Sequence, residues 1–139
     1  MTQPLREIEP GLRARVPVTR ITHSDNKCVH SYYTMPVESA DGQHITYFEF
    51  DLPQVNRNHL ETLEGTLMVA NPDGSDPQPM ARMKGSPAQG AMGQWVGDTR
   101  RLAAVSGYDH FWMVVDPETQ ALWRGVERMR EMGPDGQNM

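Results

Sequence analysis

The 139-residue sequence contains a single cysteine, Cys28. One thiol cannot form a disulfide within the chain, and it cannot supply a cysteine-rich zinc site. Two interpretations of Cys28 remain: a nucleophile or lone metal ligand, or a small apolar residue near the start of a strand. The sequence favours the second, because free cysteines in proteins most often behave as buried apolar residues.

Basic charge and long apolar runs are also scarce. The chain has 13 Lys plus Arg against 18 Asp plus Glu, a formal net charge of −5. Without a long basic run, nucleic acid is not an expected partner. The N-terminus lacks the apolar run of a secretory signal, and no segment approaches the length of a membrane span. We therefore expect a cytoplasmic protein with no membrane partner.

Familiar catalytic motifs are missing as well. The sequence has no Ser-His-Asp order, no phosphate-binding glycine loop and no paired-carboxylate motif. The histidines form no HxH, HxxxH or HExxH spacing with a carboxylate partner; they are His23, His30, His44, His59 and His110. A metal site assembled within this chain is therefore not expected.

What the sequence does contain is a repeated pattern. An Asp-Gly or Gly-Asp turn precedes an apolar strand, and a second apolar strand follows and ends at an acidic turn. The first copy comprises the turn 39–42, strands 45–48 and 67–70, and the turn 71–74. The second comprises the turn 96–99, strands 102–105 and 112–115, and the turn 116–119. A third copy begins at 133–136.

Repeats of about 40 to 45 residues with four short strands are typical of β-propeller blades. We predict an all-β fold, a partial β-propeller of two four-stranded antiparallel blades plus the start of a third. The predicted parts are a lead-in at 1–15, a strand at 16–22, blades at about 29–82 and about 90–125, and the next blade from about 130–139. Since about four to eight blades close a propeller, missing blades or another chain would complete the ring. We expect a truncated product, a fragment or part of an assembly.

The pattern also predicts individual segments. The first blade is expected to open with a strand over 29–37, and residues 51–65 to form a long polar loop. The proline-bearing segment 71–90 is interpreted as turns and connection. Three tryptophans within strand patterns are assigned to the blade core, namely Trp95, Trp112 and Trp123.

Several segments resemble the N-terminal part of the oligogalacturonide lyase family. They are 18–22, Cys28 with the cluster His30-Ser31-Tyr32-Tyr33, Ala40-Asp41-Gly42 before an apolar strand, and Gln94-Trp95-Val96-Gly97-Asp98. The resemblance covers most of residues 16–136, about a third of a complete family member. It implies a seven-bladed propeller whose central funnel cleaves short pectin fragments, which are acidic oligosaccharides, by β-elimination.

The resemblance further implies a divalent metal, typically manganese, held by His and Gln side chains in the complete family member, with a histidine base and an arginine nearby. Removing the proton beside a uronate carboxylate builds enolate-like charge that a metal ion or an arginine stabilises. A histidine titrating near neutrality can accept that proton. In the family these residues lie in later blades. This chain alone is therefore expected to hold no cofactor and no catalytic residue, and to be inactive.

Four residues are candidates for substrate binding: His30, Tyr32, Tyr33 and Gln94. In this hypothesis His30 contacts a sugar carboxylate, an aromatic ring supports a pyranose face, and Gln94 reaches the funnel. The alternative is that the tyrosines pack between blades and His30 is a solvated loop residue. Alternation along a strand places Tyr32 and Tyr33 on opposite faces, so at most one is expected to face a ligand.

A second functional hypothesis has the same fold. Propellers also serve as non-catalytic interaction modules, and similar Asp-Gly turns occur in the propeller of the Tol system and other WD-like proteins. Under this hypothesis the chain offers its face to a protein partner, and the loop over 51–65 is the expected contact.

Overall fold

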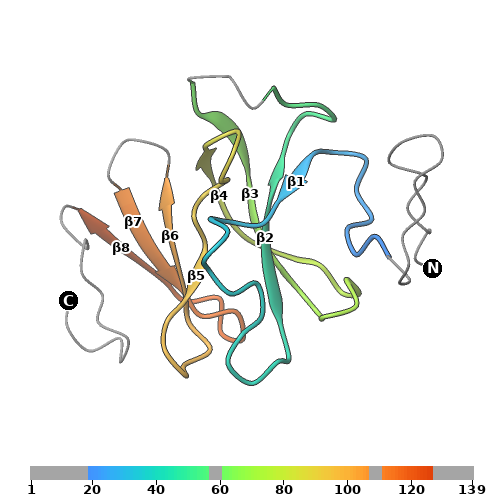
Figure 1. The fold of residues 1–139 in the computed structure, drawn as a ribbon. Helices are drawn as coiled ribbons and strands as arrows, with labels where there is room; N and C mark the ends of the chain where they lie inside the picture. The colour runs from blue at the N-terminus through green and yellow to red at the C-terminus, as the bar shows by residue number, and fades with distance from the viewer. Residues whose placement is uncertain (1–18, 57–60, 107–110, 127–139) are drawn as a thin grey trace.

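A computed structural model describes residues 19–56, 61–106 and 111–126. These residues form eight strands and no helix, arranged as two four-stranded antiparallel sheets (Figure 1). Sheet 1 contains β1 (Cys28–Val29), β2 (Ile45–Phe50), β3 (Leu63–Ala70) and β4 (Gln78–Gly85). Sheet 2 contains β5 (Gln94–Trp95), β6 (Leu102–Ser106), β7 (Phe111–Val115) and β8 (Leu122–Val126). The predicted all-β class and the two antiparallel four-stranded units are confirmed.

Each sheet is a meander, because strands that follow one another along the chain are hydrogen-bonded neighbours. Within the described ranges, no helix is long and apolar enough to cross a membrane.

The composition of β2 gives sheet 1 a cluster of apolar side chains on each face. Its sequence, Ile-Thr-Tyr-Phe-Glu-Phe, is rich in the β-branched and aromatic residues that favour strands. Phe48 and Phe50 contribute to the core shared with sheet 2, on the inner face of sheet 1. Ile45 and Tyr47 belong to a separate cluster on the outer face. Alternation along one strand therefore supplies two apolar faces.

The main core lies between the two inner faces. Phe48 and Phe50 are fully buried, and their rings meet edge to face with centroids 5.0 Å apart. Further buried members come from five strands of the two sheets and from the connection between β4 and β5, and they are Leu67, Val69, Met83, Ala91, Trp95, Leu102, Ala104, Met113 and Val115. The shared core joins the sheets into one packed unit.

The two sheets repeat each other in register as well as in order. Ile45 pairs with Ala70 in sheet 1, as Leu102 pairs with Val115 in sheet 2. The bridge between Glu38 and Ile45 has its counterpart in the pair Trp95 and Leu102.

The turns before the second strands also match. In sheet 1, Ser39 N donates to His44 O at 2.9 Å, and in sheet 2 Val96 N donates to Arg101 O at the same distance. A second pair of bonds matches as well: Gly42 N donates to Ser39 O at 2.8 Å, and Thr99 N donates to Val96 O at 3.1 Å. The sequence repeat is thus a structural repeat.

Four predictions of segments need correction. Of the strand expected over 29–37, only Val29 is in a strand, the two-residue β1, after which the chain turns and makes a single bridge at Glu38. The segment 71–90 is not all turn and connection, because it contains the eight-residue strand β4. Pro79 is accommodated there because β4 is an edge strand and the pairing shifts between Leu67 and Met68.

The loop predicted over 51–65 is also shorter, since β3 begins at Leu63. Residues 20–22 of the strand predicted over 16–22 hold no strand, and residues 16–18 lie outside the described part of the chain. The lead-in at 1–15 and the third repeat from about 130–139 also lie outside it.

Candidate functional site

A hollow of about 460 Å³ opens where the chain leaves β1. We call it the aromatic hollow. One wall is the segment that runs through and beyond β1, and the other is the turn between β4 and β5. Its lining residues are Lys27, Cys28, Val29, His30, Ser31, Tyr32, Tyr33, Ala88 and Gln89. Three of the four predicted substrate-binding residues, His30, Tyr32 and Tyr33, therefore lie together.

Tyr32 and Tyr33 sit side by side rather than on opposite faces. Their ring centroids are 4.3 Å apart, with planes tilted by 41°. The prediction from alternation was wrong because this segment is a turn, in which Met35 N donates to Tyr32 O at 2.9 Å. Tyr33 is 78% exposed, and hydrogen bonding to the Tyr33 side chain raises the pKa of Tyr32. The pair offers an aromatic surface to solvent.

The second wall depends on Gly90. Gly90 N donates to Ser86 O at 2.7 Å and closes the turn that presents Ala88 and Gln89. Gly90 has a φ of 58°, in the left-handed region that favours glycine. A Cβ there would also stand 3.1 Å from Val29 Cγ2 and 2.5 Å from Phe48 Cβ. Glycine therefore lets the two walls approach each other.

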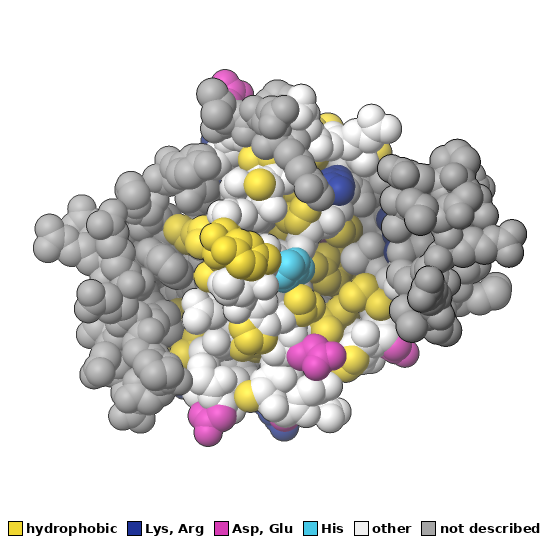
Figure 2. All heavy atoms as spheres, in the orientation of Figure 1, with side chains coloured by type: hydrophobic (Ala, Val, Ile, Leu, Met, Phe, Trp, Pro, Cys, Tyr) yellow, Lys and Arg dark blue, Asp and Glu magenta, His cyan; other side chains and the backbone are white. Residues whose placement is uncertain are grey.

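The polar groups of the aromatic hollow are few and of mixed type. Lys27 supplies an ammonium, His30 an imidazole, and Gln89 an amide. The Ser31 hydroxyl is largely buried and donates to Met35 Sδ at 3.2 Å. On the face shown in Figure 2, hydrophobic side chains lie beside a histidine, and acidic side chains lie mostly toward the lower edge. The lining thus combines two tyrosine rings, a few small apolar side chains and several polar groups, and apolar walls with a few polar groups are the usual form of a ligand site.

Gln94, the fourth predicted residue, lies elsewhere. It is exposed and pairs with Ala103 in sheet 2. Ala103 pairs with Val114, and Val114 with Trp123, so these four side chains form one row on the outer face of sheet 2. Gln94 does not line the aromatic hollow.

The three tryptophans have different outcomes. Trp95 is buried in the core as predicted, and its Nε1 donates to Val37 O at 3.0 Å. Trp123 is 48% exposed, with the Arg101 guanidinium 5.1 Å from its ring centre, so its assignment to the core was wrong. The side chain of Trp112 lies outside the described part.

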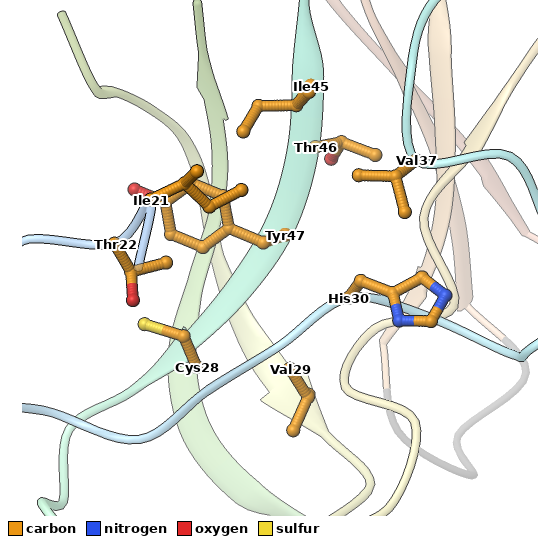
Figure 3. Close-up of a pocket in the computed structure, with 9 residues that line it drawn as sticks. All are labelled: Ile21, Thr22, Cys28, Val29, His30, Val37, Ile45, Thr46 and Tyr47. Carbon is orange, nitrogen blue, oxygen red and sulfur yellow. The ribbon is translucent and has the colours of Figure 1, made fainter. Parts of the chain in front are cut away.

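A second hollow of about 190 Å³ lies over β2 on the outer face of sheet 1 (Figure 3). We call it the β2 hollow. Its lining is mainly apolar: Ile21, Thr22, Cys28, Val29, His30, Val37, Ile45, Thr46 and Tyr47. Ile21 and Cys28 pack against the cluster that contains Tyr47, whereas His30 lies toward Val37.

Burial raises the pKa of two side chains of the β2 hollow, Cys28 and Tyr47. It raises the pKa of the Cys28 thiol, assisted by the Glu49 carboxylate, and it raises the pKa of Tyr47 to about 12. A thiol with a raised pKa is a poor nucleophile at neutral pH. Cys28 therefore packs as a small apolar residue, the interpretation that the sequence favours.

Among the described residues, no group of three or more His, Cys, Asp or Glu side chains is placed to hold a metal ion. Neither a family model, nor a curated protein, nor a solved structure matches the chain.

Sequence analysis missed Lys27 and Gln89. Lys27 precedes β1 by one residue, and Gln89 lies more than fifty residues away in a turn. A basic residue next to the aromatic cluster was a usable signal for Lys27. Gln89 had none, because only the closure of the 86–90 turn brings it to the tyrosines.

Proposed function

We propose that sheets 1 and 2 are consecutive blades of a β-propeller similar to oligogalacturonide lyases, and that the aromatic hollow binds one residue of an acidic oligosaccharide. The observation that carries the proposal is the pair of Tyr32 and the exposed Tyr33 beside Lys27 and His30 in a single hollow. The matching register of the two sheets supports the propeller organisation.

Each lining group has a task in this proposal. The Tyr33 ring packs against the C–H face of a pyranose, since aromatic rings provide rigid apolar area at low entropic cost. The Lys27 ammonium attracts the uronate carboxylate as a mobile point charge. Gln89 and His30 donate to or accept from ring hydroxyls. Binding and orientation are the roles of this chain.

Catalysis is not assigned to these residues. β-Elimination needs a base and a group that stabilises enolate-like charge. In the family that the sequence resembles, a divalent metal supplies that stabilisation from other blades. The described part of this chain has no cluster that fits such an ion. We therefore propose that the chain binds the sugar, and that bond cleavage requires residues outside it.

Calorimetric titration with trigalacturonate tests the proposal, with a neutral galactose trisaccharide as the matched ligand. We expect the acidic sugar to bind more tightly, and the difference to shrink as salt screens Lys27. Tyr33→Ala should weaken binding about tenfold or more, as loss of an anchoring aromatic does. Gln89→Ala should weaken it less.

Gln94→Ala is the matched control for Gln89→Ala, because Gln94 is an exposed glutamine on another face. Equal affinity for the acidic and neutral sugars would contradict the assigned role of Lys27. An unchanged affinity in Tyr33→Ala would remove the aromatic hollow from the site.

One observation favours the second hypothesis, an interaction module. Sheet 2 leaves two large apolar side chains exposed on β8, Leu122 at 38% and Trp123 at 48%. Exposed aromatic residues with an arginine nearby are typical of protein contact sites. Association and sugar binding use different faces, so the two functions are compatible.

A further inference from the structure

The turn that presents Tyr32 and Tyr33 is closed by Met35 in two ways. The backbone N of Met35 donates to Tyr32 O at 2.9 Å, which makes Tyr33 and Thr34 the central residues of a β-turn. The thioether Sδ of Met35 accepts a hydrogen bond from the Ser31 hydroxyl at 3.2 Å. The side-chain contact therefore joins the residue before the turn to the last residue of the turn.

The chain on either side of this turn is fixed to the two sheets. Val29 belongs to β1 of sheet 1. Val37 O accepts a hydrogen bond from Trp95 Nε1 of sheet 2 at 3.0 Å. The residues between these two anchors form no strand. The contact between Ser31 and Met35 therefore helps to fix where the tyrosine rings lie above the aromatic hollow.

Met35 is more accessible than the methionines of the core. Met83 is 5% exposed and Met113 is 3% exposed, and both pack between the sheets. Met35 is half-buried, so part of it is open to an oxidant in solvent. Three further half-buried methionines belong to other segments, and they are Met68, Met80 and Met92. Among these side chains, it is the sulfur of Met35 that contacts the turn of the tyrosines.

We propose that Met35 is a peroxide-sensitive modification site, and that its oxidation weakens binding of the acidic sugar in the aromatic hollow. This inference rests on the proposed function of that hollow. In the reaction a sulfur lone pair attacks one oxygen of a hydroperoxide, the S–O bond forms and the O–O bond breaks. The other oxygen leaves with the proton of the attacked oxygen, as water or an alcohol. Sulfur is oxidised by two electrons and the peroxide is reduced by two.

The sulfoxide is incompatible with the contact to Ser31. A thioether sulfur is a weak acceptor, whereas a sulfoxide is polar and carries an added oxygen. Ser31 is only 8% exposed, so this oxygen must either enter a buried position or point away from the hydroxyl. In the first case it displaces the turn, and in the second the Ser31 hydroxyl loses its acceptor. Either result loosens the turn and displaces the rings of Tyr32 and Tyr33.

Calorimetric titration with trigalacturonate before and after peroxide treatment tests the proposal, with peptide mass spectrometry to confirm the sulfoxide at Met35. We expect the affinity of the wild type to fall at least about fivefold, and methionine sulfoxide reductase to restore it. Met35→Gln, which places a polar group at the same position, should bind weakly without peroxide. The double variant Ser31→Ala/Met35→Leu makes both partners apolar, so it should bind like the reduced wild type and ignore peroxide.

Met80→Leu is the matched control, because it removes another half-buried methionine, in β4, and should stay as sensitive to peroxide as the wild type. The double variant retains Cys28 and the other methionines, so any response that it keeps comes from them. Unchanged affinity of protein that carries the sulfoxide at Met35, or an equal loss in the double variant, would overturn the proposal.

A measurement without sugar separates this inference from the proposed function. The ring centroids of Tyr32 and Tyr33 are 4.3 Å apart, so their protons should show a nuclear Overhauser contact that weakens when Met35 is oxidised. If the reduced protein does not bind trigalacturonate, the proposed function is wrong. A ring contact that stays unchanged in the oxidised protein would show that Met35 does not control the turn.

Discussion

At the scale of single residues, Phe48 organises the core, and three glycines make room for its ring. A Cβ at Gly65, Gly85 or Gly90 would lie 2.5 Å from an atom of the Phe48 side chain. Real Cβ atoms do not approach so closely, so alanine at Gly65 or Gly85 displaces the Phe48 ring, and alanine at Gly90 collides with the Phe48 Cβ. The three glycines therefore determine how the Phe48 side chain packs, as much as the neighbouring apolar side chains do.

Phe48→Ala should lower the free energy of unfolding by about 3 to 5 kcal/mol, because it removes a fully buried ring and leaves a cavity. Urea unfolding followed by circular dichroism measures the loss. Phe48→Leu, which retains much of the volume, should cost less and covers the case in which the alanine variant does not fold. Tyr33→Ala, at an exposed position, should leave the midpoint almost unchanged; a comparable loss there would contradict the assigned core.

Tyr47 predicts a dependence on alkaline pH. Burial raises the pKa of Tyr47 to about 12 in the folded state, while an unfolded tyrosine ionises near pH 10. The contribution of this hydroxyl to stability is thus complete below about pH 10 and is lost as pH rises toward about 12. Between about pH 9 and 11.5, the melting temperature of Tyr47→Phe should fall less than that of the wild type. Parallel curves would show that Tyr47 is not desolvated in the folded state.

Single residues also show what the sequence can and cannot predict. His30 and the two tyrosines were recognisable as candidates because aromatic and imidazole groups cluster in four consecutive positions. Their arrangement was not, because a period of two holds only within a strand and this segment is a turn. Trp123 matched a strand pattern, but a strand has two faces, and the sequence alone does not show which of them another sheet covers.

At the scale of elements, the turn after β3 touches the segment that borders the β2 hollow. Gly74 has a φ of 82°, and a Cβ there would overlap the Ile21 carbonyl oxygen. Gly42 has a φ of 67° in the preceding turn, but a Cβ there meets nothing within 4 Å. Alanine at Gly42 therefore tests backbone strain alone, whereas alanine at Gly74 tests the same strain together with a steric clash.

Gly42→Ala should cost about 1 to 2 kcal/mol, the penalty for a left-handed alanine. Gly74→Ala should cost more, because the Ile21 segment must also leave its place. Trypsin cleavage after Arg20 reports on that displacement, since Arg20 donates to Ser24 O at 2.5 Å in the native fold. Faster cleavage is expected in Gly74→Ala than in Gly42→Ala, and equal rates would argue against this contact.

Strands with a strong local sequence signal were predicted well, and strands with a weak or misleading one were not. The central strands β2, β6 and β7 were predicted because apolar runs lie between Asp-containing turns. β4 was missed because the four prolines between residues 71 and 90 suggested a connection, whereas the edge position and the shift at Leu67 and Met68 tolerate Pro79. β1 was predicted too long, since β-branched and aromatic composition continues beyond the point where pairing stops.

At the scale of the whole molecule, two kinds of contact join the sheets beyond the core. Trp95 Nε1 donates to Val37 O at 3.0 Å, and this hydrogen bond is partly buried. Arg100 forms an ion pair with Asp41 at 3.5 Å, and within sheet 2 it also pairs with Glu118; these side chains are substantially exposed. Both contacts connect sheet 2 to the segment that precedes β2.

Trp95→Phe should lower the free energy of unfolding by about 1 to 3 kcal/mol, because it leaves the Val37 carbonyl without its donor and reduces packing. Arg100→Ala should have little effect, since solvent and salt screen exposed ion pairs. Chemical denaturation of both variants gives the comparison. A larger loss for Arg100→Ala would mean that the surface ion pairs, and not the buried hydrogen bond, hold the sheets together.

The sequence repeat was sufficient to predict two similar antiparallel units, because each unit is local in the chain. The relation of the hollows to those units was not predictable. For the aromatic hollow it depends on a contact between segments more than fifty residues apart, Gln89 beside the tyrosines. Long-range packing of this kind leaves little trace in local composition.

The most direct measurement of the central claim is chemical-shift mapping of isotope-labelled protein during titration with trigalacturonate. The account predicts that the largest shifts fall on Lys27, His30, Tyr32, Tyr33 and Gln89, with Gln94 and Trp123 unaffected. Shifts that centre on the outer face of sheet 2, or an absence of shifts at saturating sugar, would contradict the assignment of the aromatic hollow as the sugar site.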